Sequence, residues 1–130
     1  MKQKKLLIIE DSNTQAIAIA AQLSTYEVDV IIANDGPQGL RMASAMRPDL
    51  VILDVNLPSM NGYQVCRRLR RDMDTAHIPI IMLTAATSPE ETTKGLAAGA
   101  DDYIHKGADA IQNVINAAFS HGLISQSSAS

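Results

Sequence analysis

The chain has 130 residues, which is the size of one ordinary domain and is long enough to bury a substantial core. Hydrophobic residues make up 46% and charged residues 19%, a balance that is typical of globular proteins and excludes a disordered chain. The formal net charge of −3 argues against direct binding of nucleic acid.

Cysteine usage and hydropathy indicate the compartment. Cys66 is the only cysteine, so an internal disulfide is excluded, which fits a reducing cytosol. No apolar stretch approaches membrane-spanning length, and the apolar run after the basic MKQKK start is too short for a signal peptide. We therefore expect a soluble cytoplasmic protein without membrane insertion.

Five short apolar runs alternate with helical patterns, which is the sequence sign of repeated βαβ units around a parallel sheet. The predicted strands are Lys5–Ile9, Val28–Ala33, Leu50–Leu53, Ile78–Leu83 and Asp102–His105. Crossovers between parallel strands are right-handed and place helices on both faces of the sheet. The pattern predicts an α/β fold with a doubly wound sheet in three layers.

Five helices fit between and after these strands. They are expected from Ser12 or Asn13 to about Ser24, from just after Gly36 to before Pro48, over about Tyr63–Met73, from Ser88 onward, and over a region that includes Ile111–Phe119 and ends near Gly122. The fourth has the clearest start, since a capping serine precedes Pro89 and Glu91. Gly95 and Gly99 should leave its far end short or mobile. We expect one domain over residues 1–122 and a flexible tail or linker over 123–130.

Two apolar strands run directly into carboxylates. The first is followed by Glu10 and Asp11, and the third by Asp54. A charge at the exit of a buried strand costs desolvation energy unless something there uses it. In doubly wound sheets, ligands bind beyond the carboxyl ends of the strands, where the strand order reverses. If the first and third strands are neighbours, the three acids converge on one crevice.

Converging carboxylates repel one another and need either a shared proton or a cation. Mg²⁺ is the natural choice, because it prefers oxygen ligands and keeps positions open for water and phosphate. The fourth and fifth strands end at Thr84 and Lys106, a hydroxyl and a cation that suit phosphate oxygens. The pattern predicts a magnesium site that is open to a phosphoryl group.

Four segments carry a family resemblance. They are IIED at Ile8–Asp11, LDVNLPSMNG at Leu53–Gly62, LTA at Leu83–Ala85 and GADDYIHK at Gly99–Lys106. In this order, and each at a predicted strand exit, they resemble the receiver domains of two-component response regulators, over the chain up to about Gly122. The resemblance implies a flavodoxin-like sheet with strand order 2-1-3-4-5 and five helices.

The resemblance also implies a role for each site residue. Asp54 would be the phosphorylation site, a nucleophile that takes a phosphoryl group from phosphohistidine. Asp11 and Asp54 would ligate Mg²⁺ directly, Glu10 through water, and Asn56 through its backbone carbonyl. Lys106 and Thr84 would hold phosphoryl oxygens. The domain would not be an enzyme but would assist its own phosphorylation and dephosphorylation, with Asn56 and Ala86 tuning the dephosphorylation rate.

A switch and a set of partners follow from the same resemblance. After phosphorylation, Thr84 would move toward Asp54 and Tyr103 would turn inward, which changes the surface of the fourth helix, fifth strand and fifth helix. That surface would bind a downstream target, a fused output domain or a second copy in a homodimer. The phosphodonor would be a histidine kinase or a histidine phosphotransfer protein.

Three features leave questions for the structure. Gly107 stands where the family commonly has proline, which leaves the pose of Lys106 open. The first helix is apolar almost all round, either for extra core packing or for docking a histidine-bearing helical bundle. The arginines between positions 67 and 71 are expected to form a solvated helix face.

Other functional classes fit less well. A phosphatase of the haloacid dehalogenase type needs an acid where this chain has Asn56, and a P-loop hydrolase needs a glycine-rich loop that is missing. A flavodoxin-like carrier would place its cofactor phosphate against Glu10 and Asp11. The remaining alternative is a degenerate receiver that binds proteins without phosphorylation, although such a domain would have lost an acid or the lysine.

Overall fold

A computed structural model of the chain describes residues 3–85 and 88–124. Its sheet has five parallel strands in the order β2-β1-β3-β4-β5, as predicted. The strands are β1 (Lys4–Ile9), β2 (Val28–Ala33), β3 (Leu50–Asp54), β4 (Ile80–Thr84) and β5 (Asp102–His105). The order reverses between β1 and β3, and Ile9 pairs with Leu53, so Glu10 and Asp54 leave the sheet side by side.

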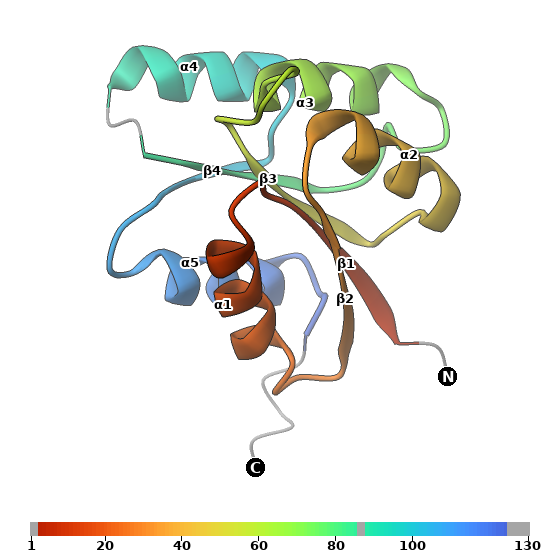
Figure 1. Cartoon of the computed structure of the whole chain (residues 1–130), viewed down its shortest axis with the longest axis vertical. Helices are drawn as coiled ribbons and strands as arrows, with labels where there is room; N and C mark the ends of the chain where they lie inside the picture. The colour runs from red at the N-terminus through yellow and green to blue at the C-terminus, as the bar shows by residue number, and fades with distance from the viewer. Residues whose placement is uncertain (1–2, 86–87, 125–130) are drawn as a thin grey trace.

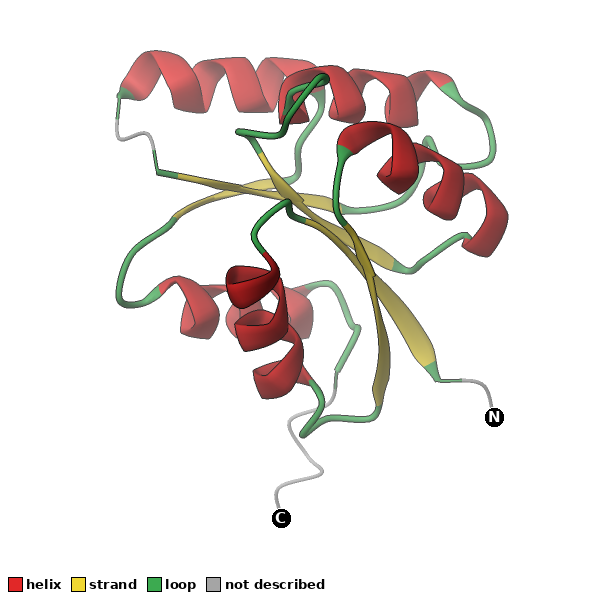
Figure 2. Ribbon diagram, in the orientation of Figure 1, coloured by secondary structure: helices red, strands yellow, loops and turns green. Residues whose placement is uncertain are grey.

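Helices cover both faces of this sheet (Figures 1 and 2). They are α1 (Asn13–Leu23), α2 (Gly36–Met46), α3 (Gly62–Arg71), α4 (Pro89–Ala98) and α5 (Ala110–Ser120). Helices α1 and α5 lie on one face, and α2, α3 and α4 lie on the other. The described residues thus form the expected three layers.

The alternation of side chains along β1 and β3 divides the core in two. Leu6 and Ile8 pack with the α1 and α5 face, whereas Leu7 and Ile9 pack with the face under α2, α3 and α4. All five residues of β3 are buried, including Asp54. This burial on both faces is the reason that β3 reads as a continuous apolar run in the sequence.

Helix boundaries follow the capping residues. The side chains of Ser12, Asp35, Asn61 and Ser88 each accept a hydrogen bond from a backbone N–H in the first turn of the following helix. The expectation of a far end that is short or mobile is met differently: Gly95 does not shorten α4, which continues to Ala98 and ends at Gly99 with φ of 109°. A mobile far end stays a prediction. Gly99 supplies the left-handed conformation that ends many helices.

Two regions differ in detail from the sequence expectations. Arg70 does not lie on a solvated face but is half-buried, and its guanidinium donates to the backbone carbonyls of Ala76, Ile78 and Gly99 and to the carboxylate of Asp101. At the other end of the chain, Leu123 and Ile124 are buried in the core beside α1 and α5. The packed part of the chain therefore reaches at least Ile124.

None of the helices within residues 3–85 and 88–124 combines the length and the hydropathy that crossing a bilayer requires.

The start of α3 packs directly against the strand end that carries Asp54. A Cβ atom on Gly62 would lie 2.5 Å from the carbonyl oxygen of Asp54 and 2.7 Å from Cα of Val55. The Gly62 N–H also donates to the Val55 carbonyl over 2.8 Å. Only a residue without a side chain allows this approach of two backbones.

We expect Gly62→Ala to destabilise the fold by about 1–3 kcal/mol, because backbone rather than a flexible side chain must move to admit the methyl group. Urea unfolding measures the loss. The matched control is Gly107→Ala, where the nearest side-chain atom would be an ordinary 3.4 Å away. Equal stability of the two variants would contradict the close packing at the end of β3.

Candidate functional site

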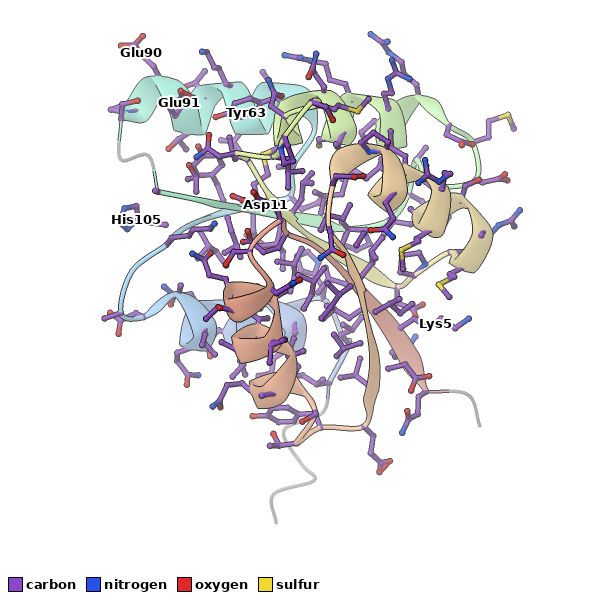
Figure 3. The ribbon with its side chains drawn as sticks, in the orientation of Figure 1. Lys5, Asp11, Tyr63, Glu90, Glu91 and His105 are labelled. Carbon is purple, nitrogen blue, oxygen red and sulfur yellow. The ribbon has the colours of Figure 1, made fainter. Side chains whose placement is uncertain are left out.

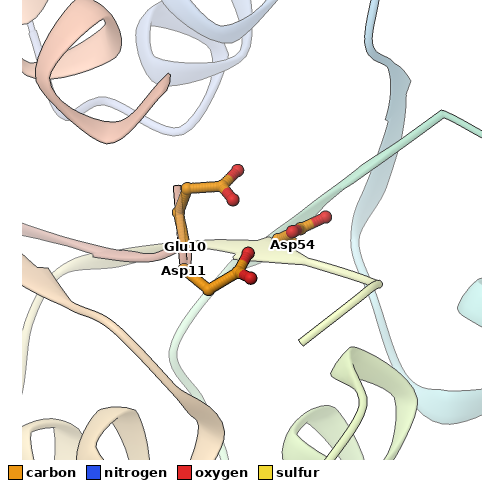
Figure 4. A group of neighbouring side chains, drawn as sticks. All are labelled: Glu10, Asp11 and Asp54. Atoms are coloured by element: carbon orange, nitrogen blue, oxygen red, sulfur yellow. The ribbon is translucent and has the colours of Figure 1, made fainter. Parts of the chain in front are cut away.

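Three carboxylates meet at the carboxyl end of the sheet (Figure 4). Glu10 and Asp11 follow β1, and Asp54 is the last residue of β3. One oxygen from each residue lies within 4.8 Å of the others. Glu10 is 1% exposed and Asp54 2% exposed, whereas Asp11 is open to solvent. The predicted convergence of these acids is therefore present.

Lys106, the residue after β5, completes the cluster. Its Nζ atom lies 3.0 Å from Oε1 of Glu10 and 3.1 Å from Oδ1 of Asp54. The Lys106 backbone N–H donates to the Thr84 carbonyl over 2.6 Å, which holds the residue at the sheet edge. The ammonium thus points into the acids although Gly107 replaces the usual proline.

Burial and pairing change the proton affinities of these groups. Burial raises the pKa of Glu10 to about 7, against the opposing effect of the hydrogen bond from Lys106. Burial also acts to lower the pKa of Lys106, but the hydrogen bonds to Glu10 and Asp54 outweigh it and raise that pKa above its ordinary value. Lys106 therefore stays a cation at neutral pH.

The donor set fits a divalent cation that prefers oxygen. Even with Glu10 partly protonated at neutral pH, the three acids carry more negative charge than one ammonium neutralises. The exposed Asp11 keeps one side of the cluster open. The backbone N–H of Asn56 donates to Oδ1 of Asp54 over 3.3 Å, which helps to orient that carboxylate. Mg²⁺ is commonly held in this way, by few protein carboxylates and several waters.

The other predicted site residues lie on the neighbouring strands. Thr84 ends β4, one residue beyond the β4 partner of Asp54, and it is fully buried. Tyr103 lies on β5, three residues before Lys106, and is half-buried. Ala86 lies outside the described residues.

Sequence patterns missed two residues of this region. They predicted Tyr63 only as the start of a helix and Glu91 only as part of a cap. The Tyr63 hydroxyl lies 2.6 Å from Oε2 of Glu91 and 3.3 Å from the Tyr103 hydroxyl. No local motif could have shown this group, because its members come from α3, α4 and β5.

A pocket of about 350 Å³ opens beside Lys106, between α1 and α5. Ala18 and Ile19 line it from α1, and Gly107 and Ile111 line it from the β5–α5 side. Ala18 is exposed, and so are Ile17 and Ala21 on the same helix. Extra core packing therefore does not explain why α1 is apolar almost all round.

The family model for the response regulator receiver domain matches residues 6–118. The chain belongs to this family. As a receiver domain it is a signalling domain of two-component systems rather than a classical enzyme, and its acid cluster is compatible with magnesium.

Relatives and solved structures agree with this assignment. The receiver domain is 41% identical over 105 residues to the DNA-binding dual master transcriptional regulator RpaA of Synechocystis sp.. The matched region covers 81% of this chain and 44% of RpaA. The chemotaxis protein CheY4 of Vibrio cholerae superposes with a TM-score of 0.84 at 29% identity, over 92% of this chain and 98% of that one. The chain spans less than half the length of the curated relatives it matches.

A further solved structure bears on the acid cluster. The receiver domain of the sensor histidine kinase PA1611 from Pseudomonas aeruginosa has a magnesium ion coordinated in its active site cleft. It superposes with a TM-score of 0.82 at 28% identity and covers 93% of this chain and 99% of that one.

We expect Mg²⁺ to stabilise the receiver domain, because the cation relieves repulsion within the acid cluster of the folded state only. At ten times its dissociation constant, it should add about 1.4 kcal/mol to the free energy of unfolding. Urea unfolding with MgCl₂, against NaCl at equal ionic strength, measures this effect. Asp11→Asn should reduce the stabilisation, whereas Asp29→Asn, exposed on β2, should retain it. Equal stabilisation of both variants would contradict metal binding at this cluster.

Proposed function

We propose that this receiver domain accepts a phosphoryl group on Asp54. The observation that carries the proposal is the ammonium of Lys106, 3.1 Å from a buried carboxylate at the end of the central strand. A carboxylate in such a position can act as a nucleophile, and its product is an acyl phosphate. The Lys106 ammonium lies where it can stabilise the negative charge of the new phosphoryl group. The domain matches receiver domains over residues 6–118, which supports the same chemistry.

In the transfer, a carboxylate oxygen of Asp54 forms a bond to phosphorus while the phosphorus–nitrogen bond of a phosphohistidine breaks. The electron pair of that bond stays on the nitrogen, and the ring takes one proton from solvent to leave as neutral imidazole. Lys106 and the Thr84 hydroxyl would hold the phosphoryl oxygens. Asp11, Asp54 and the Asn56 carbonyl would hold Mg²⁺ directly, and Glu10 would hold it through water. When bound, the cation would supply charge neutralisation between the carboxylates and the incoming phosphoryl group. Catalysis consists mainly of alignment and electrostatics, and this chain assists it without being an enzyme.

The phosphodonor is a histidine kinase or a histidine phosphotransfer protein. The exposed apolar side chains of α1 and the 350 Å³ pocket beside Lys106 offer a docking surface for a helical donor. Ile17 is 61% exposed there, so an apolar contact at this helix would bury surface that now meets water. This contact would bring the donor histidine close to Asp54.

The output follows from a shift between two conformations of the α4–β5–α5 surface. Thr84 moves toward the phosphorylated Asp54, and Tyr103 turns inward in a larger fraction of the molecules. The phosphoryl group favours the active state through this difference in contacts. The surface then binds a downstream target, an output domain in a longer chain or a second copy of the domain. Asn56 and Ala86 set the lifetime of the phosphorylated state.

Asp54→Asn should abolish phosphorylation, because an amide is no nucleophile at this position. Intact-mass spectrometry after incubation with acetyl phosphate and Mg²⁺ detects the gain of one phosphoryl group. Asp109→Asn changes an exposed aspartate whose side chain makes no capping bond, and it should label like the wild type. A wild-type chain that does not label would instead favour the degenerate, phosphorylation-independent binding module.

Lys106→Met should slow labelling by acetyl phosphate roughly 100-fold, the usual cost of losing one fixed donor to a developing negative charge. The variant keeps the length of the side chain but removes its charge. Lys94→Met, on the exposed side of α4, is the matched control and should label at the wild-type rate. An unchanged rate in Lys106→Met would rule out this role of the lysine.

A further inference from the structure

A second polar cluster lies on the α3 and α4 side of the sheet, apart from the acids. The Tyr63 hydroxyl, at the start of α3, lies 2.6 Å from Oε2 of Glu91 and 3.3 Å from its backbone carbonyl. The same hydroxyl lies 3.3 Å from that of Tyr103 on β5. Figure 3 shows Tyr63 and Glu91 next to each other by α4, away from Asp11. One phenol thus joins three elements that are far apart in the sequence.

The direction of these hydrogen bonds can be assigned. A tyrosine hydroxyl has one proton, and a carboxylate can only accept, so Tyr63 donates to Glu91. Its oxygen is then free to accept, so Tyr103 is the donor in the contact between the two hydroxyls. Burial and the hydrogen bond to Glu91 raise the pKa of Tyr63 above its ordinary value, which keeps the phenol protonated at neutral pH. The cluster is a directed chain from Tyr103 through Tyr63 to Glu91.

Gly95 provides the space that the Tyr103 ring occupies. A Cβ atom on Gly95 would lie 2.5 Å from Cδ2 and Cε2 of Tyr103, so the ring packs against the backbone of α4. A glycine inside a helix costs roughly 1 kcal/mol relative to alanine. The contact with Tyr103 is a structural reason for glycine at this position of α4.

Two contacts hold the Tyr103 side chain. Its ring lies against α4, and its hydroxyl is hydrogen-bonded to the hydroxyl of Tyr63. Glu91 lies in the first turn of α4, the helix that follows Thr84 in the chain. A displacement of this turn away from α3 stretches the bond between Tyr63 and Glu91. A rotation of Tyr103 toward solvent breaks its bond to Tyr63.

We propose that Tyr63 is a positioning residue, whose hydroxyl holds the Tyr103 ring in its inward position against Gly95 and ties that ring to the first turn of α4. The proposal rests on the proposed function in one respect, namely that Tyr103 and α4 belong to the surface that changes on phosphorylation. In the resting domain, the cluster then favours the inward state of Tyr103 before any phosphoryl group arrives.

The test is Tyr63→Phe in the full 130-residue chain, which keeps the ring and removes only the hydroxyl. Side-chain coupling constants from NMR give the ratio of inward to outward Tyr103 rotamers without a phosphodonor. We expect this ratio to fall about fivefold, the value of one ordinary hydrogen bond. Tyr26→Phe is the control, because Tyr26 packs against Phe119 on the other side of the sheet, and it should leave the ratio unchanged.

A mutant cycle separates positioning from general packing. Glu91→Ala should also lower the inward fraction, and the double variant Tyr63→Phe with Glu91→Ala should be no worse than Tyr63→Phe, because Glu91 acts on Tyr103 through Tyr63. Glu91→Gln keeps an acceptor oxygen, so it should lower the inward fraction of Tyr103 less than Glu91→Ala does. Urea unfolding of each variant verifies that it is folded.

An unchanged Tyr103 ratio in Tyr63→Phe, or fully additive effects in the double variant, would overturn the proposal. Labelling of Asp54 by acetyl phosphate is measured on the same samples. A wild-type chain that does not label refutes the proposed function, whereas the rotamer ratio decides the role of Tyr63 independently.

Discussion

The structure depends on the electrostatic balance at the carboxyl end of the sheet. Glu10 and Asp54 are almost fully buried, and placing two carboxylates there costs desolvation energy and repulsion. Lys106 offsets part of this cost through contacts of 3.0 and 3.1 Å. The remaining negative charge makes the cluster compatible with a divalent cation. The proposed binding of Mg²⁺ and phosphate at this edge would be a consequence of an incompletely neutralised cluster.

The surrounding layers hold that cluster in place. β3 is buried on both faces, and Gly62 brings α3 against the backbone at Asp54. The backbone N–H of Lys106 donates a hydrogen bond to the carbonyl of Thr84. A side chain on a central strand between two packed layers has few alternative positions. The acids therefore meet in the folded chain without help from a ligand, which is the pre-organisation that the proposed phosphoryl transfer would require.

One strand connects the acid site with the helical surface. Tyr103 and Ile104 are consecutive on β5, yet Tyr103 packs with the side under α2, α3 and α4 and Ile104 with the α1 and α5 side. Lys106 follows at the end of the same strand. β5 and the residue after it thus bring Lys106 to the acids and Tyr103 to α4, so the proposed phosphorylation site and the proposed switch share one short segment.

The sequence by itself determined the fold class, the strand order through the family resemblance, and the convergence of Glu10, Asp11, Asp54 and Lys106, because these follow from apolar runs that end in polar residues and from short motifs. Tertiary structure alone decided which distant residues touch. The half-buried role of Arg70, the continuation of α4 through Gly95 and the Tyr103–Tyr63–Glu91 chain all depend on contacts between elements. The local sequence pattern indicates the hydrophobic periodicity and the boundaries of each helix and strand. Which side chains contact one another is decided only when the layers pack.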